Sequence, residues 1–317
     1  MDKSNIPSYK DIESAHRKIA HNIHETPVIT CSAINGLAGA SLFFKCENFQ
    51  KAGAFKFRGA SNAVLSLSDE DARKGVATHS SGNHAAALAL AAKLRGIPAY
   101  IAMPETAPAI KKKAVAGYGA KIRFCQPTVE SREDTLQKII EETGATFIHA
   151  YNDFNIISGQ GTAVKELLNQ VKDLDVIVAP VGGGGLLSGT AIWAKHFNPG
   201  IRVIAGEPEK ADDAYRSFKT GVLQPAVPPG SMADGLLMPL SDLTFSIIRE
   251  YVDEIVTVSE ESIVGAMQLI WERMKIIAEP SSAVALAAVI KKKHELKKVR
   301  TGIILSGGNV DLKKLPF

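Results

Sequence analysis

Short apolar runs alternate with longer amphipathic stretches along most of the chain. A turn that carries glycine or serine follows several of these runs, and helical stretches of about ten residues or more lie between them. Strands that alternate with helices of this length predict right-handed βαβ units and parallel sheets. We expect strands at 75–79, 99–102, 121–124, 146–150, 175–181, 202–206 and 301–305, and helices at 83–94, 130–142, 161–171, 186–196 and 260–274.

The length and composition predict an ordinary globular protein with two domains. The chain has 317 residues, which is long for a single core, and is 45% hydrophobic and 22% charged. No apolar stretch approaches the ~18 residues that a membrane span needs, and the polar N-terminus lacks a signal region. We therefore expect a cytoplasmic protein that has no membrane partner.

Charge and cysteine usage exclude further classes. The net charge is only +4, and the lysine runs at 111–113 and 291–293 have no interleaved aromatic residues, so we expect no nucleic-acid partner. Cys31, Cys46 and Cys125 lie far apart and show no metal-binding spacing. They are typical of reduced core thiols.

Three polar turns lie where predicted strands end, at residues 80–84 (Ser-Ser-Gly-Asn-His), 182–185 (four glycines) and 306–309 (Ser-Gly-Gly-Asn). Ligands of parallel sheets bind at the carboxyl ends of the strands, where the topology switches. The three turns can therefore converge on one site, although they span more than two hundred positions.

The four glycines favour a phosphate site. Their backbone N–H groups can point at one anion, and the helix that follows adds its positive N-terminal end. The spacing matches neither the dinucleotide fingerprint nor the P-loop, so a lone phosphate group fits better. A flexible turn without a ligand is the alternative interpretation.

Lys56 is a candidate nucleophile because it lies between Phe55 and Phe57. Desolvation there would lower the pKa of its amine and favour attack on an aldehyde, although a structural lysine with an exposed end is the alternative. The turn at 80–84 could bind a carboxylate or merely cap a helix. Ser306 could equally be an ordinary turn residue.

An amine, a phosphate loop, a carboxylate cradle and a hydroxyl together describe pyridoxal phosphate with an amino acid. With these motifs the sequence resembles the fold-type II pyridoxal-phosphate enzymes, in the serine/threonine dehydratase and serine racemase branch. The resemblance covers essentially the whole chain. Its motifs are residues 45–51, 55–60, 80–84, 182–185, 279–281 and 306–309.

The resemblance implies a tryptophan synthase β-like fold with two open parallel-sheet domains and flanking helices. A large cofactor-binding domain would contain residues 1–66 and 152–317, and a small mobile domain residues 67–151. Lys56 would form a Schiff base with the cofactor and later move the Cα proton, and Ser81 would be the second acid–base group on the opposite face. The implied cofactor-binding residues are Phe55, Lys56, Asn83, Gly182, Gly183, Gly184, Gly185, Glu279 and Ser306, and the implied substrate-binding residues are Ser80, Ser81, Asn83, His84 and Arg132.

The implied reaction is dehydration and deamination of a β-hydroxy L-amino acid, namely L-serine, L-threonine or L-threo-3-hydroxyaspartate, to a 2-oxo acid and ammonia. Ser306 is neutral and cannot keep the ring nitrogen protonated, which favours elimination over transamination. Serine racemisation with side dehydratase activity is the alternative, because Ser81 could return the proton from the other face. Leu237 and Met238 replace serines of animal racemases and make the pocket wall more apolar.

Other activities fit the sequence less well. A β-replacement synthase would carry a threonine-rich carboxylate loop, a non-catalytic module would have lost Lys56, and a nicotinamide enzyme would carry the glycine fingerprint. The few residues after Ser306 leave no room for the C-terminal regulatory domain of biosynthetic threonine dehydratases, so we expect no isoleucine feedback.

The resemblance also implies a metal site and a homodimer. Glu207, the carbonyl of Ala211 and Asp213 would hold Mg²⁺, or Ca²⁺ or Mn²⁺, in the large domain; a solvated acidic loop is the alternative. Lys51 and the lysines at 111–113 could supply charge to a nucleotide effector, but their pattern does not decide this.

Overall fold

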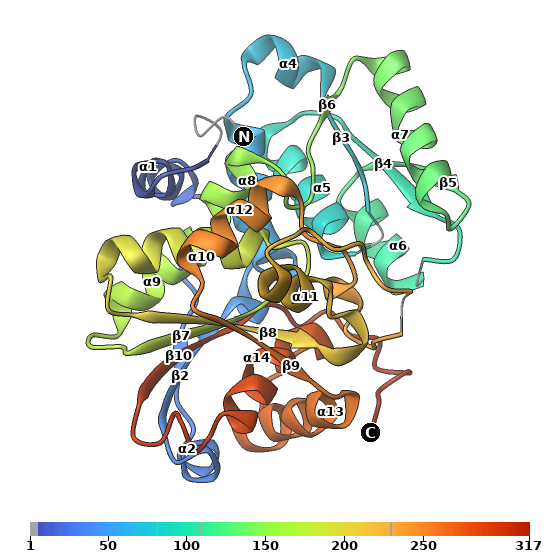
Figure 1. Cartoon of the computed structure of the whole chain (residues 1–317). Coiled ribbons are helices and arrows are strands. Elements are labelled where there is room, and N and C mark those ends of the chain that lie inside the picture. Colours follow the sequence, from blue (N-terminus) through green and yellow to red (C-terminus); the bar gives the residue numbers. More distant parts are fainter. Residues whose placement is uncertain (1–5, 81, 108, 229) are drawn as a thin grey trace.

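Two mostly parallel β-sheets organise the chain in this computed structural model, which describes residues 6–80, 82–107, 109–228 and 230–317 (Figure 1). The six-stranded sheet has the order β1-β2-β10-β7-β8-β9, and only β1 is antiparallel to its neighbour. The four-stranded sheet has the order β5-β4-β3-β6 and is parallel throughout. The strands are β1 (Val28–Ile29), β2 (Ser41–Cys46), β3 (Val76–His79), β4 (Ala99–Pro104), β5 (Lys121–Cys125), β6 (Thr146–Phe147), β7 (Val176–Pro180), β8 (Arg202–Pro208), β9 (Glu254–Val258) and β10 (Arg300–Leu305).

Helices cover both faces of the six-stranded sheet (Figure 1). One core packs α2, α13 and α14 against it, and a second core packs α1, α9, α10 and α12 against the other face. A third core joins α3 and α5 to the four-stranded sheet. The helices are α1 (Tyr9–Ile19), α2 (Ser32–Ala38), α3 (Lys56–Leu65), α4 (Asp69–Lys74), α5 (Asn83–Arg95), α6 (Ala109–Gly117), α7 (Val129–Thr143), α8 (Phe154–Gln160), α9 (Thr162–Gln170), α10 (Gly185–Phe197), α11 (Asp213–Thr220), α12 (Asp242–Tyr251), α13 (Glu260–Leu269) and α14 (Pro280–Lys291).

The burial of the strands explains their sequence. All five residues of β7 are buried, because helices cover both faces of the sheet at this point. Such a strand is a continuous apolar run rather than an alternating one. α14 begins with Pro280, whose missing N–H costs nothing in the first turn of a helix.

The predicted fold class is confirmed, and most predicted strands are present within a residue or two of their predicted ends. Three details differ. The strand predicted at 146–150 ends at Phe147, because the chain then turns around the side chain of His149. The helix predicted at 260–274 ends at Leu269 and continues as a π-helical turn to Met274. Strands β1, β2 and β9 were not predicted.

A buried group of four charged side chains holds α3 in place. The guanidinium of Arg58 is fully buried and donates to both carboxylate oxygens of Glu47 (2.7 and 2.8 Å) and of Glu166 (2.7 Å each). Lys45 Nζ donates to Glu166 Oε2 (2.6 Å). Two positive and two negative charges therefore balance between β2, α3 and α9, so that none is left buried without a partner.

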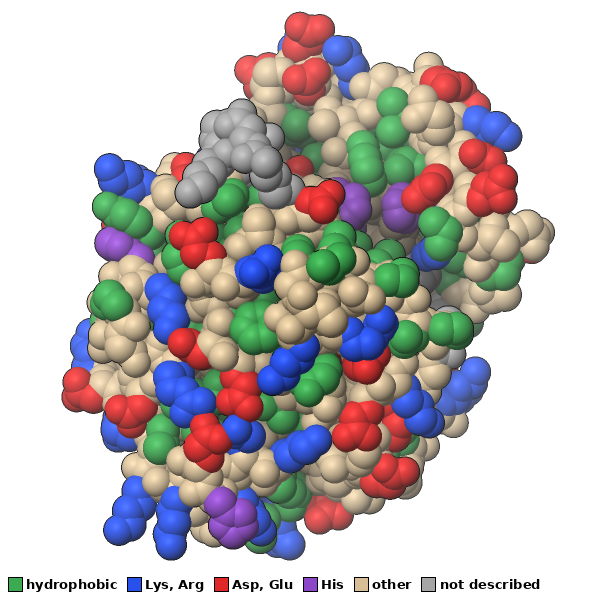
Figure 2. Space-filling model, viewed as in Figure 1, with side chains coloured by type: hydrophobic (Ala, Val, Ile, Leu, Met, Phe, Trp, Pro, Cys, Tyr) green, Lys and Arg blue, Asp and Glu red, His purple; other side chains and the backbone are tan. Residues whose placement is uncertain are grey.

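Charged side chains of both signs, Lys and Arg together with Asp and Glu, are mixed on the face of the molecule that Figure 2 shows. In the part of the chain that the structure describes, no helix combines the length and the apolar character needed to cross a membrane.

Candidate functional site

Lys56 is the first residue of α3, and the residues before it are fastened to the turn that follows β10. Ala54 forms an antiparallel bridge with Gly307, and the Phe55 N–H donates to the carbonyl of Ser306 (2.9 Å). Two predicted motifs that lie 250 positions apart are thereby brought into direct contact. The prediction that the turns converge on Lys56 is consistent with this contact.

Lys56 is partly buried, and its amine has one hydrogen-bond acceptor among the described residues. Its Nζ donates to the carbonyl of Ala150 (2.7 Å) and lies 5.1 Å from the centroid of the Phe55 ring. Burial lowers the pKa of Lys56 to about 8. A substantial fraction of the amine is then neutral at mildly basic pH, which is the form that attacks an aldehyde.

The glycine loop leaves its amides free. The N–H groups of Gly182, Gly183 and Gly184 have no hydrogen-bond partner among the described residues, and α10 begins at the next residue. A Cβ on Gly183 would lie 2.4 Å from the Tyr151 ring, and one on Gly182 would lie 2.7 Å from the backbone of Leu236. Only glycine fits here, and the free amides at a helix N-terminus suit an anion.

Asn83, Glu279 and Asn309 connect the other turns by hydrogen bonds. Asn83 Nδ2 donates to Glu279 Oε1 (2.7 Å), and Asn309 Nδ2 donates to Asn83 Oδ1 (3.0 Å). The Glu279 N–H donates to the carbonyl of Gly307 (3.0 Å). Burial raises the pKa of Glu279 to about 8 and so favours its protonated form at neutral pH.

The turn at 80–84 is described except for Ser81, which lies outside the described residues. His84 is buried, and its Nε2 lies 3.1 Å from the carbonyl of Ile148, to which it must donate. Its Nδ1 is a buried acceptor without a partner among the described residues, and burial lowers the pKa of His84 to about 3. A neutral side chain in this tautomer has no N–H for a carboxylate, so we expect the backbone N–H groups at the start of α5 to bind it.

Three residues of the site were not predicted: His149, Ala150 and Tyr151. The carbonyl of Ala150 accepts the Lys56 amine, and the Tyr151 ring lies against the glycine loop. The segment therefore joins the lysine to the anion site. A histidine near the end of the predicted strand 146–150 and a tyrosine directly after it were the signal that could have revealed it.

A comparison with known families shows which family the chain belongs to. The family model of the pyridoxal-phosphate dependent enzymes matches residues 19–307. The chain belongs to this family.

Individual relatives match the chain over almost its full length. It is 54% identical over 312 residues to the β-hydroxyaspartate dehydratase of Paracoccus denitrificans, with 98% of this chain and 99% of the relative covered. It is 53% identical to the serine racemase of Dictyostelium discoideum, with 99% and 98% covered. The structure of maize serine racemase is 48% identical and superposes with a TM-score of 0.94, with 97% of this chain and 95% of that chain covered.

The residues present fit pyridoxal phosphate, the cofactor of the family. The Lys56 amine has a lowered pKa and contacts the carbonyl of Ala150. The next residue, Tyr151, lies against the glycine loop, whose backbone amides are free and whose glycines leave no room for a side chain. The hydroxyl-bearing residue Ser306 is buried beside Phe55. The individual roles of these residues stay predictions.

Arg132 lies at the edge of this group. It is partly exposed on α7, and its Nε donates to the carbonyl of Thr128 (3.3 Å). Its charge helps to lower the pKa of His79, which precedes Ser80, after burial has lowered it most. Within the described residues no hydrogen bond or ion pair joins Arg132 to Lys56 or Asn83, so its substrate-binding role stays a prediction.

Glu207, Ala211 and Asp213 form a separate buried acidic site. The two oxygens of Glu207 accept the N–H groups of Ala214 (2.9 Å) and Tyr215 (2.7 Å) at the start of α11. Burial raises the pKa of Glu207 to about 9 and that of Asp213 to about 6. No cluster of three His, Cys, Asp or Glu side chains that could hold a metal ion occurs in the described ranges.

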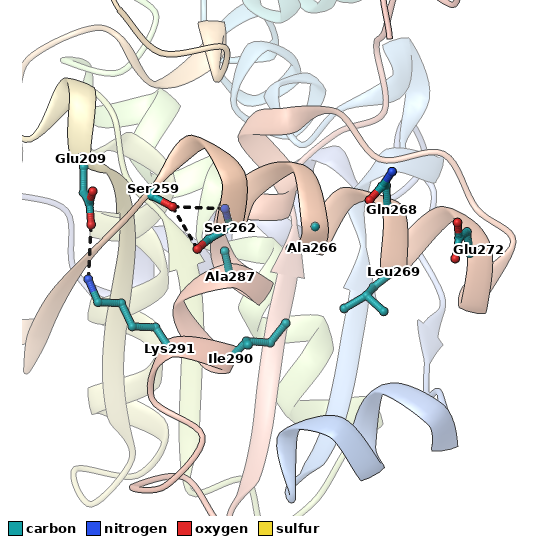
Figure 3. Close-up of a pocket in the computed structure, with 11 residues that line it drawn as sticks. Glu209, Ser259, Ser262, Ala266, Gln268, Leu269, Glu272, Ala287, Ile290 and Lys291 are labelled. Atoms are coloured by element: carbon teal, nitrogen blue, oxygen red, sulfur yellow. Dashed lines mark hydrogen bonds and ion pairs between the residues drawn. The ribbon is translucent and has the colours of Figure 1, made fainter. Parts of the chain in front are cut away.

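A hollow elsewhere on the protein shares no residue with the site around Lys56. It has a volume of about 690 Å³ and lies between α13 and the end of α14 (Figure 3). Ala266, Leu269 and Ile290 form its apolar part, and Lys291 reaches across to Glu209 (3.5 Å). It contains none of the predicted catalytic or cofactor-binding residues.

Proposed function

We propose that the protein catalyses the pyridoxal-phosphate dependent dehydration of a β-hydroxy L-amino acid to a 2-oxo acid and ammonia. The observation that carries this proposal is the Lys56 amine, held between the Phe55 ring and the carbonyl of Ala150 and tied to the Ser306 turn. The resemblance to a β-hydroxyaspartate dehydratase supports it. L-Serine, L-threonine and L-threo-3-hydroxyaspartate are the candidate substrates.

Each part of the site has a task in this reaction. The free amides of the glycine loop would hold the phosphate of the cofactor, and the Ser306 hydroxyl would be the group that meets its ring nitrogen. The backbone N–H groups at the start of α5 orient the substrate carboxylate. Lys56 then stands beside Cα as the base that removes its proton.

The proposed reaction needs neither an oxidant nor a reductant. When bound, the cofactor withdraws electrons from Cα and makes its proton acidic. The proton that Lys56 removes from Cα and the hydroxyl that leaves Cβ together make one molecule of water. A water molecule then replaces the amino group, so the net products are one 2-oxo acid and one ammonia.

The direct test is an assay of the purified protein with pyridoxal phosphate and Mg²⁺. L-Serine, L-threonine and L-threo-3-hydroxyaspartate are supplied separately, and 2-oxo acid, ammonia and D-enantiomer are measured. We expect 2-oxo acid and ammonia in equal amounts from at least one substrate. We expect the Lys56→Ala variant to lose turnover of every substrate, because no other amine replaces Lys56.

The matched control is Lys113→Ala, which removes an exposed lysine on α6 and should leave the rate unchanged. Wild-type activity in the Lys56→Ala variant, or no 2-oxo acid from any of the three substrates, would show that the proposed function is wrong.

Serine racemisation is the second candidate, because serine racemases of several organisms are about half identical to this chain. Racemisation needs a second acid–base group, and we propose Ser81 for this task. Ser81→Ala should abolish the formation of D-serine, measured by chiral chromatography. D-Serine production that persists in this variant would refute the role of Ser81.

We also propose that Glu207, the Ala211 carbonyl and Asp213 hold a divalent cation such as Mg²⁺. Both carboxylates are buried, and each oxygen of Glu207 accepts one N–H and so keeps a lone pair. Two carboxylates and a carbonyl are oxygen ligands of the kind that Mg²⁺ and Ca²⁺ take. Such an ion would stabilise the loop between β8 and α11.

The arrangement of the two sheets supports a division into moving parts. All four strands of the smaller sheet lie within residues 67–151, and we propose that this segment moves as a small domain against the rest.

We further propose a homodimer, supported by the exposed apolar side chains of Leu312 and Phe317. The free thiols of Cys31, Cys46 and Cys125 support a cytoplasmic location.

A further inference from the structure

Two histidines lie close enough to Lys56 for its charge to lower their pKa values. The two rings use opposite nitrogen atoms for their hydrogen bonds to the backbone. His84 donates through Nε2 to the carbonyl of Ile148, which leaves it only an acceptor, Nδ1. His149 has the reverse arrangement. Its Nδ1 lies 3.2 Å from the backbone N of Tyr151 and 2.9 Å from that of Asn152.

The hydrogen bonds of His149 fix its tautomer. Both backbone N–H groups are donors, so Nδ1 must offer its lone pair, and the ring proton of the neutral form lies on Nε2. Burial, followed by the charges of His79 and Lys56, lowers the pKa of His149 to about 4. The ring is therefore neutral at physiological pH, and its only polar hydrogen is the Nε2–H.

The packing of the ring leaves this N–H available. The His149 ring meets Tyr151 edge-on (4.6 Å between ring centroids), Phe147 at 5.7 Å and His79 at 6.5 Å, and these contacts fix its plane. Nε2 has no hydrogen-bond partner among the described residues, yet it is not among their fully buried unpartnered atoms. Because the His149 side chain is only partly buried, we infer that Nε2 faces space that solvent can enter.

The place of His149 in the chain puts this donor beside the reaction. The next residue, Ala150, accepts the Lys56 amine, and Tyr151 covers the glycine loop. A rigid, neutral donor in this position matches an oxygen on the substrate better than it matches a second amine. A donor at a leaving oxygen stabilises the negative charge that grows there as the bond to carbon breaks.

We propose, on the basis of the dehydration proposed above, that the Nε2–H of His149 donates a hydrogen bond to the hydroxyl oxygen on Cβ of the substrate. His149 thereby selects substrates that carry an oxygen at this carbon and assists its departure. The imidazole keeps its proton throughout. The water is still made from the Cα proton and the leaving hydroxyl.

Two substitutions separate this role from a purely structural one. His149→Asn keeps an acceptor near the position of Nδ1 for the backbone N–H groups of Tyr151 and Asn152, but it removes the distal donor. His149→Gln places an amide N–H near the position of Nε2 and loses the proximal acceptor. The two variants therefore remove opposite halves of the histidine.

Two substrates isolate the hydrogen bond to oxygen. L-Serine and β-chloro-L-alanine both yield the same 2-oxo acid, but chloride leaves without help from a donor. We expect His149→Asn to lower kcat/KM for L-serine by at least about tenfold and that for β-chloro-L-alanine by less than about threefold. We expect His149→Gln to retain much of the activity on L-serine.

Thermal unfolding of the cofactor-free proteins and the absorbance of the bound cofactor provide readouts that do not depend on turnover. His149→Gln should unfold at a lower temperature than His149→Asn, because it leaves two backbone N–H groups without their acceptor. Both variants should bind the cofactor with the wild-type absorbance.

The outcomes are distinct. Equal losses on the two substrates, or a His149→Gln variant that is less active on L-serine than His149→Asn, would overturn the role of His149. If wild-type protein forms no 2-oxo acid from any β-hydroxy amino acid, the proposed dehydration itself fails, whatever the variants do.

Discussion

At the scale of single residues, the environment of each side chain decides what it can do. Burial lowers the pKa of Lys56 to about 8, which would make its amine a more effective nucleophile. His84 and His149 are both neutral, yet their hydrogen bonds make one an acceptor and the other a donor. Residue type alone would have assigned the two histidines the same role.

The pKa of Lys56 predicts the pH dependence of cofactor capture. Below its pKa the amine is an ammonium ion without a lone pair, so the rate at which cofactor-free protein binds pyridoxal phosphate should rise with pH and reach half of its maximum near pH 8. Stopped-flow absorbance of the cofactor follows this rate. A midpoint near 10.5, the ordinary value for lysine, would contradict the assigned environment.

At the scale of elements, α3 is the part that positions the lysine. Its first turn is held from two sides, by the bridge between Ala54 and Gly307 and by the ion pairs of Arg58 with Glu47 and Glu166. The helix cannot shift along its axis without separating buried charges. The position of the Lys56 amine therefore depends on contacts in the core on the other side of α3.

Arg58→Met should destabilise the protein by about 3–5 kcal/mol, because the buried carboxylates of Glu47 and Glu166 lose the guanidinium that contacts both, and Lys45 contacts only Glu166. Arg123→Met is the matched control. Arg123 makes a similar two-oxygen contact with Glu142, but both side chains are about half exposed, and the cost should be below about 1 kcal/mol. Urea unfolding monitored by circular dichroism measures both, and equal costs would refute the explanation.

Elements and motifs could be predicted from sequence to different degrees. β7 and its glycine loop were predicted because a strand buried on both faces is continuously apolar and the glycines follow it directly. β2 was missed because Lys45 interrupts its apolar run. A buried lysine is possible there because partners distant in the sequence accept from its amine, among them Glu166, 121 positions away. His149 was missed for a similar reason, because its role follows from contacts made after the chain turns.

At the scale of the whole molecule, the candidate site takes its residues from the segments of both sheets. The six-stranded sheet supplies the Ser306 turn and the glycine loop, and the segment with the four-stranded sheet supplies Asn83 and Ala150. Lys111 on α6 forms an ion pair with Asp234 of the 3₁₀ turn Asp234–Leu236, whose Leu236 lies against Gly182. Relative motion of the two sheets would therefore open or close the site.

The proposed cation should affect the stability of the molecule rather than its chemistry. Mg²⁺ that binds only the folded protein at a concentration of 100 times Kd would stabilise it by about 2.7 kcal/mol. We expect EDTA-treated protein to unfold at a lower temperature and Mg²⁺ to restore the midpoint, measured by differential scanning calorimetry. Glu207→Gln should abolish the effect of Mg²⁺ on the unfolding midpoint. If Mg²⁺, Ca²⁺ and Mn²⁺ all leave the midpoint of the wild-type protein unchanged, Glu207 only caps α11.

The position of β10 between β2 and β7 has a consequence for synthesis in the cell. Of the ten strands that the structure describes, β10 is made last, yet it lies inside the larger sheet and carries the turn that fastens Phe55. A growing chain on the ribosome thus contains Lys56 long before the turn that fixes the segment of Lys56 has been made. Loading with the cofactor must wait until residue 307 has emerged, so an unfinished chain cannot start the chemistry of the finished one.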